Sequence, residues 1–279
     1  MRPPRMLRQL MQRRSVLFSA LLLLAIAVLA VGAPVLAGAD PNEMAVLRRL
    51  QAPSAEHLLG TDELGRDVYA RVVHGARHSL AIAALTALGA VLAGSALGLL
   101  AGFLRRLDAP LMRVVDAMLS FPDILLAIAL VAVLGPSPRN TVLALVLVYT
   151  PRVARVVRAS TLVLRELLFV EAVRALGVRS TRILWRHILP NLTSPILVQL
   201  SFIFACALLA EAGLSFLGVG VPPDIPTWGS MVAGSQQYAH QAFWVVLFPG
   251  LAIIFSALAL QLLGDGVRDL LDPRLQKAA

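Results

Sequence analysis

The chain of 279 residues contains a single lysine, Lys277, close to its C-terminus. A phosphate-binding loop of the form GxxxxGK[ST] requires a lysine that reaches the nucleotide phosphates, and no such loop surrounds this residue. The sequence therefore excludes ATP hydrolysis by P-loop chemistry within this chain. Cysteine is equally scarce. Cys206 stands alone inside an apolar run, so no internal disulfide can form, and we interpret it as a core thiol.

Charged residues are also few, at 15% of the chain against 58% hydrophobic residues, and the mean hydropathy is +0.78. Soluble domains are nearer ~25% charged and ~45–50% apolar. Several apolar segments reach the ~20 residues that cross ~30 Å of hydrocarbon as a helix. The segments are 15–38, 80–104, 114–135, 141–157, 195–218 and 242–264. We therefore predict an all-α polytopic membrane protein with six transmembrane helices.

The first apolar segment, 15–38, follows five arginines and ends at Ala37-Gly38-Ala39, which resembles a signal-peptidase site. Its apolar run is longer than the roughly 7–15 residues of a signal-peptide core. We interpret it as an uncleaved signal anchor after a cytoplasmic tail, 1–14. Either interpretation places the following stretch outside the cell.

Lysine and arginine are distributed unevenly between the connections on the two sides of the predicted membrane. With the N-terminus inside, the inner segments carry 19 of them and the outer segments carry 6. The inner segments are 1–14, 105–113, 152–186 and 265–279, and the outer ones are 39–79, 136–140 and 219–241. This bias predicts a bacterial inner membrane protein with both termini in the cytoplasm. The third outer segment is rich in Gly and Pro, and we expect Trp228 in it to anchor at the membrane interface.

Signatures of catalysis, metal binding and nucleic-acid binding are weak or missing. His74 and His78 could share a helix face, but HExxH fails because Gly75 follows His74, so a structural or surface pair is favoured over a metal site. No GxSxG sequence occurs. The net charge of +9 could suggest nucleic acid, but the arginines flank apolar spans and no basic stripe with interleaved aromatic residues is present.

Two acidic residues lie within or beside apolar segments: Asp123, directly after Pro122, and Glu211 in LLAEAGLSFLG. A carboxylate inside a membrane is costly and suggests either a hydrogen-bonded structural group or a contact with the substrate path. Both alternatives remain open from the sequence, with the structural one favoured. Pro122 is expected to kink the third helix or to lie in its first turns.

The stretch Glu171–Asn191, EAVRALGVRSTRILWRHILPN, places four arginines and a histidine between two apolar segments. Apolar residues before Gly177 recur at helical spacing, and this glycine is expected to end a first short helix. Ser180 can cap a second helix that begins near Thr181, and Pro190 is expected to stop or bend it. Such a helix pair could lie on anionic headgroups or insert into a groove of another protein.

The order of residues in this stretch resembles the EAA loop of ABC-transporter permease subunits. The matching residues are Glu171, Ala172, Gly177, Leu189 and Pro190. Val173 replaces an alanine of the motif and His187 an isoleucine, which leaves the helix-glycine-helix order intact.

Further stretches resemble the dipeptide/oligopeptide/nickel permeases, above all their second permease subunit (dipeptide permease C-like). They are LGTDELGRDV (59–68), FPDILLAIALVAVLGP (121–136), EAGLSFLGVGVPP (211–223), PTWGSM (226–231), FPGLAI (248–253) and LLGDGVRDLLDPR (262–274). The resemblance spans about residues 55 to 274 in the order of the family.

This resemblance implies a type I ABC importer permease fold and a non-enzymatic role. The chain would pair with a homologous permease subunit as a heterodimer, and two cytoplasmic ATPase subunits would bind ATP and Mg. No cofactor is expected in this chain. A substrate-binding protein would deliver the ligand from outside, and the loop around Gly177 would dock on one ATPase. Rigid-body movement would then couple ATP hydrolysis to transport.

Peptides are the favoured substrate, because nothing in 39–79 or 219–241 is typical of a metal site; nickel or another small solute is the alternative. An ion-coupled secondary transporter or a membrane-anchored structural or regulatory protein are alternatives of other classes. The expected organisation is a cytoplasmic tail, a signal anchor, an extracytoplasmic segment, a permease core that contains the coupling loop, and a second cytoplasmic tail. The corresponding ranges are 1–14, 15–38, 39–75, 76–265 with the loop 158–194, and 266–279.

Overall fold

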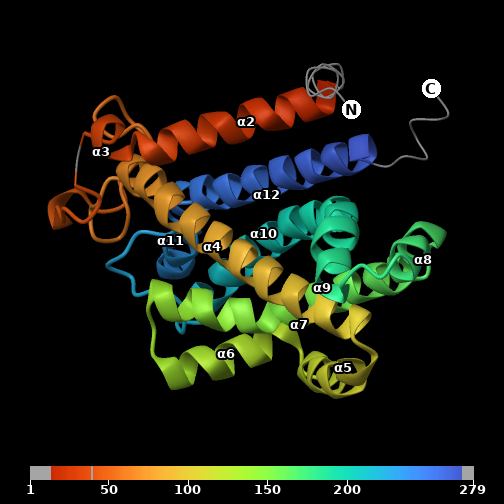
Figure 1. Ribbon diagram of the computed structural model, residues 1–279. Helices are drawn as coiled ribbons and strands as arrows, with labels where there is room; N and C mark the ends of the chain where they lie inside the picture. The colour runs from red at the N-terminus through yellow and green to blue at the C-terminus, as the bar shows by residue number, and fades with distance from the viewer. Residues whose placement is uncertain (1–13, 39, 272–279) are drawn as a thin grey trace.

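The computed structural model describes residues 14–38 and 40–271, and these are mainly helical. Five long helices form the body: α2 (Arg14–Val31), α4 (Val68–Phe103), α7 (Pro138–Arg165), α10 (Thr193–Phe216) and α12 (Trp244–Leu271). Figure 1 shows α3 (Ala33–Leu36), the segment 40–67 and α11 (Trp228–Gly234) at one end of this body, and α8 (Leu168–Ala175) at the opposite end. We name these the α11 end and the α8 end.

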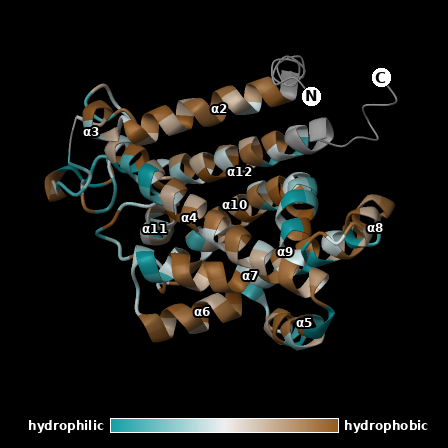
Figure 2. Ribbon diagram, viewed as in Figure 1, coloured by the Kyte–Doolittle hydropathy of each residue, from teal (hydrophilic) through white to brown (hydrophobic). Residues whose placement is uncertain are grey.

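The connections contain little regular structure beyond short helices. In the part of the chain that the structure describes there is no β-strand, only an isolated antiparallel bridge between Thr61 and Asp67. Short 3-10 helices lie at η1 (Val46–Arg48) and η4 (Gln236–Tyr238). Figure 2 shows hydrophobic residues along the long helices and hydrophilic residues concentrated in the 40–67 segment and at the chain's turns.

Among the described residues, three helices are long and apolar enough to cross a membrane: Val68–Phe103, Ser180–Phe216 and Trp244–Gly266, with mean hydropathies of 2.1, 2.0 and 2.3. The bent helix pair Arg105–Leu119 and Asp123–Leu134 raises this number to four if the pair counts as one span. The apolar part of α2 that is described, Val16–Val31, is shorter. The predicted number of six spans is therefore not reproduced by length and composition alone.

The third predicted span, 114–135, is not one helix. It divides into α5 (Arg105–Leu119) and α6 (Asp123–Leu134), whose axes meet at 91°. Pro122 lies directly before α6 as its N-cap, so the break falls at the proline rather than inside a kinked helix. Proline lacks an N–H and disfavours helical geometry in the residue before it, and this explains why α5 cannot continue into α6.

The fourth predicted span, 141–157, lies in one helix that is longer than the span, α7. Its apolar sequence stops at Pro151, yet α7 continues through this buried proline to Arg165. Three arginines in the second half of α7 pair with aspartates of α5 and α6. The pairs are Arg152–Asp123, Arg155–Asp116 and Arg158–Asp108. The arginines that follow the apolar part of α7 therefore lie against partners on α5 and α6.

Helices α4 and α7 pack closely because glycines on α4 face α7. A Cβ added to Gly94 would lie 2.5 Å from Val153 Cβ, and one on Gly98 would lie 2.5 Å from the carbonyl oxygen of Ala154. One turn further, a Cβ on Gly102 would lie 2.6 Å from Thr161 Cβ. Small residues four apart let two helices approach closely in a membrane, where packing drives association.

Candidate functional site

The predicted coupling insert is a folded protrusion at the α8 end (Figure 1). Helix α8 ends at Ala175, and Gly177 adopts φ +75°, the left-handed conformation that terminates helices. Its N–H donates to Arg174 O at 3.0 Å. The glycine therefore separates two helices as its position in the sequence predicts.

The second half of the insert differs from the prediction. Ser180 is the first residue of α9 (Ser180–Ile183), and Arg179 is the N-cap without a side-chain hydrogen bond. The expected Ser180 cap is therefore wrong, because the helix begins one residue earlier.

Of the stop or bend expected at Pro190, the stop is wrong. The π-helical turn η2 (Leu184–Ile188) and the 3-10 helix η3 (Leu189–Leu192) carry the chain directly into α10. Pro190 lies in the first turn of η3, where its missing N–H costs little. Leu189 N donates to Leu184 O across the π turn, and Asn191 Nδ2 donates to His187 O at 2.6 Å. A local change of helix type therefore accommodates the proline.

The insert is fixed on one side and exposed on the other. Val170, Ile183, Ile188 and Leu192 are at most 1% exposed. Large apolar side chains on the opposite side are exposed: Leu168 at 83%, Leu176 at 80% and Trp185 at 65%. Exposed apolar groups on an anchored protrusion are typical of an interaction surface.

The residues that match the EAA pattern lie on this protrusion with different accessibility. Glu171 and Ala172 lie on α8 and are exposed. Gly177 and Pro190, which lie beyond this helix, are also exposed. His187 and Leu189 are half-buried. Within residues 14–38 and 40–271, the exposed Glu171 side chain makes no hydrogen bond or ion pair.

Asp123 is not a free carboxylate. Arg152 Nη2 donates to Asp123 Oδ2 at 3.1 Å, and the guanidinium lies 5.5 Å from the Phe202 ring centroid. Arg155 Nη2 lies 2.5 Å from Asp116 Oδ1, and Arg158 makes two hydrogen bonds to Asp108. This ladder of three ion pairs was not predicted; three arginines at three-residue spacing were its signal in the sequence.

Glu211 is 1% exposed and joins α10 to the turn before α11. Ser215 Oγ donates to Glu211 Oε1 at 3.0 Å, and Thr227 Oγ1 donates to the same oxygen at 2.8 Å. The other oxygen, Oε2, has no hydrogen-bond partner among the described residues. Structural hydrogen bonds therefore satisfy one of the two carboxylate oxygens.

Trp228 is buried rather than at an interface. Its Nε1 donates to Val72 O at 2.9 Å, and a Cβ on Gly75 would lie 3.2 Å from its ring. Thr227 and Ser230 form a capping box that starts α11 and directs the indole onto α4. The expected interfacial anchor is therefore wrong: the tryptophan fills the space above a glycine.

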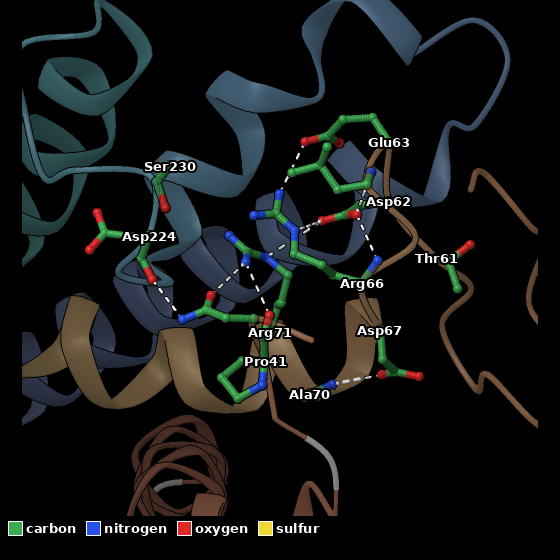
Figure 3. A network of polar contacts seen from close by, with 12 residues as sticks. Pro41, Thr61, Asp62, Glu63, Arg66, Asp67, Ala70, Arg71, Asp224 and Ser230 are labelled. Atoms are coloured by element: carbon green, nitrogen blue, oxygen red, sulfur yellow. Dashed lines mark hydrogen bonds and ion pairs between the residues drawn. The ribbon is translucent and has the colours of Figure 1, made fainter. Parts of the chain in front are cut away.

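The GTDELGRD stretch forms a polar network at the α11 end, shown in Figure 3. Arg66 Nε donates to Asp62 Oδ2 at 2.6 Å, and Arg66 NH2 donates to Glu63 Oε1 at 3.1 Å. Arg71 NH1 donates to Pro41 O at 3.1 Å, which ties the preceding loop to α4. Burial raises the pKa of the Glu63 carboxyl, and the neighbouring Asp62 adds to this shift.

Asp67 completes this network by capping α4. It accepts from Ala70 N at 2.8 Å, and His57 Nδ1 lies 2.8 Å from its second oxygen. Sequence reasoning recorded this stretch as a family motif but derived no contacts from it. The two aspartates and two arginines near a predicted helix start were the available signal.

No group of three or more His, Cys, Asp or Glu within residues 14–38 and 40–271 could hold a metal ion. His74 and His78 accordingly have no third ligand there. The described features define a polytopic helical membrane protein with a helical protrusion at one end and a polar network at the other.

Comparison with known proteins identifies the family. Residues 94–277 match the family described as binding-protein-dependent transport system inner membrane component. The chain belongs to this family and is a multi-pass inner membrane protein.

Curated relatives cover nearly the whole chain. A putative peptide transport system permease protein of Brucella suis is 51% identical over 96% of this chain and 91% of its own length. The dipeptide transport system permease protein DppC of Alkalihalophilus pseudofirmus is 42% identical over 96% and 89%. The di/tripeptide permease DppC of Pseudomonas aeruginosa is 44% identical over 93% and 88%. These matches confirm the resemblance found in the sequence.

Among solved structures, a chain of the MetNI methionine ABC transporter in an inward-facing conformation matches with a TM-score of 0.61. The match covers 72% of this chain and 96% of that chain at 18% identity. It confirms the expected type I importer permease fold.

Proposed function

We propose that this chain is the membrane-spanning permease subunit of an ATP-driven importer of peptides. The observation that carries this proposal is the 42–51% identity, over 96% of the chain, to proteins named as peptide or dipeptide permeases. The exposed apolar protrusion at the α8 end supports a role in coupling to other subunits.

The protrusion around Gly177 would dock in a cleft of one of two cytoplasmic ATPase subunits, which bind ATP and Mg. Leu168 and Leu176 would enter the cleft, while the buried Ile183 and Ile188 transmit its movement to α10. A partner permease would form a heterodimer with this chain, and a binding protein would deliver peptide at the α11 end. The excess of Arg and Lys in the inner segments supports cytoplasmic termini.

The test of coupling uses two glycines that end helices in the same way. Gly177 N donates to Arg174 O and Val178 N to Val173 O, and Gly218 N donates to Ser215 O and Val219 N to Leu214 O. Gly177→Glu and Gly218→Glu both place a bulky charge at a positive-φ residue, +75° and +77°, with nothing within 4 Å of an added Cβ, so backbone strain is matched at roughly 1–2 kcal/mol. In the purified, reconstituted complex we expect the Gly177 variant to lose most peptide uptake and peptide-stimulated ATPase activity, and the Gly218 variant to retain both.

Equal activity of the two variants would contradict the role assigned to the loop. Uptake of radiolabelled dipeptide, longer peptide and nickel by the wild-type complex tests the substrate separately. Uptake that survives loss of the ATPase subunits but collapses with the proton gradient would instead indicate a secondary transporter.

A further inference from the structure

An open cavity of about 620 Å³ lies at the α8 end, between the α4–α5 junction and the insert. Four arginines and one glutamate contribute its charged lining: Arg105, Arg106, Arg165, Arg174 and Glu166. Phe103, Leu104 and Leu107 form an apolar wall beside them. The cavity is therefore strongly basic on one side and apolar on the other.

The single glutamate cannot neutralise the arginines. Arg165 donates to Glu166 Oε1 at 2.9 Å and to Gly102 O at 2.7 Å, so it is fixed in place. Arg105 lies 4.0 Å from the same carboxylate and is largely exposed. Among the described residues, Arg106 and Arg174 have neither an ion pair nor a hydrogen bond. The guanidinium groups are therefore available to an anion, and they bind phosphate oxygens in a two-pronged geometry.

The position of the cavity favours the phosphate group of a lipid over a phosphate ion in solution. The apolar helix α4 ends at Phe103, which lies in the wall, so the cavity begins where the chain leaves the apolar region. Headgroups of phospholipids lie at this level of a membrane. Basic pockets beside membrane helices bind anionic headgroups, and each nearby arginine contributes to the attraction.

A protein partner fits the cavity less well. The most exposed apolar side chains of the insert, Leu168, Leu176 and Trp185, do not line it. The cavity shares Arg174 and Ser180 with the insert but none of these apolar side chains, so it lies beside the apolar surface that we assign to the ATPase. We propose that this cavity binds the phosphate headgroup of an anionic phospholipid, with its acyl chains along Phe103, Leu104 and Leu107.

The test compares two double variants of the purified transporter complex in mild detergent. Arg106→Gln/Arg174→Gln removes the unpaired cavity charges. Arg77→Gln/Arg139→Gln removes the same charge from exposed sites outside it. Native mass spectrometry measures the binding of phosphatidylglycerol and of phosphatidylcholine to each. We expect wild type and control to prefer phosphatidylglycerol, and the cavity variant to bind it roughly 30-fold more weakly.

Equal phosphatidylglycerol binding by the two double variants, or no preference over phosphatidylcholine, would overturn the proposal. Competition by millimolar inorganic phosphate as effective as the lipid would assign the site to a free anion instead. A photoreactive Leu107→benzoylphenylalanine variant should crosslink to lipid; crosslinking to an ATPase subunit would assign the cavity to that interface.

Discussion

At the scale of single residues, Glu211 shows how a carboxylate is held inside an apolar body. Its Oε1 accepts from two hydroxyl groups, one on its own helix and one on the turn before α11. Thr227 makes the longer-range contact, and its Oγ1 also accepts from Ser230 N at 3.0 Å. This one hydroxyl therefore both supports the carboxylate and starts α11.

Thr227→Val is therefore expected to destabilise the protein strongly. Loss of a donor to a buried acceptor costs about 1–3 kcal/mol, and loss of a helix cap adds about 1 kcal/mol. The matched control is Thr193→Val, since Thr193 Oγ1 donates only to Pro190 O at an exposed position. The thermal unfolding midpoint in detergent should fall clearly for the first variant and little for the second. Similar midpoints would contradict the role of Thr227.

At the scale of helices, the α4–α7 interface depends on glycine. Gly98→Ala would force a methyl group to within 2.5 Å of Ala154 O and 2.8 Å of Val157 Cβ. Gly250→Ala in α12 makes the same change with nothing within 4 Å. We expect the first to lower stability by about 1–3 kcal/mol through overpacking, and the second to raise it by up to about 1 kcal/mol through helix propensity. Unfolding monitored by tryptophan fluorescence distinguishes them, and equal shifts would argue against close packing.

The bend between α5 and α6 is the second feature at the scale of helices. The apolar pattern of 114–135 favours one span, but Pro122 separates two helices at 91°. The bend places Asp108, Asp116 and Asp123 along α7, where the arginines of the ladder meet them. A break that looks like a local defect therefore determines a long-range set of ion pairs.

At the scale of the whole molecule, the two ends differ in chemistry. The α8 end carries the insert and the basic cavity, and the α11 end carries the network of Asp62, Glu63, Arg66 and Arg71. If the α8 end is cytoplasmic, Thr181→Cys should react with a membrane-impermeant maleimide in inverted vesicles, and Glu56→Cys should react in spheroplasts. Both sites are exposed. Cys206→Ala provides the cysteine-free background, and the reverse labelling pattern would invert the topology.

Much of this architecture could be predicted because it depends on local properties. Apolar length indicated membrane helices, and Gly177 was recognised because the left-handed residue that ends a helix is usually glycine. Local reasoning was wrong at Ser180 and Trp228, and of the stop or bend expected at Pro190, the stop is wrong. There the outcome depended on a helix starting one residue earlier, on a π turn, and on space above Gly75.

The sequence by itself determined the membrane class, the absence of a P-loop and the helix-glycine-helix insert, since composition and short-range backbone preferences decide these. Only the tertiary structure decided which charges are paired. Arg152, Arg155 and Arg158 meet aspartates 29, 39 and 50 residues away, and Thr227 reaches Glu211 across 16 residues. Such contacts depend on how helices bend and pack. Within the described residues, the same packing leaves Arg106 and Arg174 without ion pairs beside the end of α4, and this produces the basic cavity that we propose as a phospholipid site.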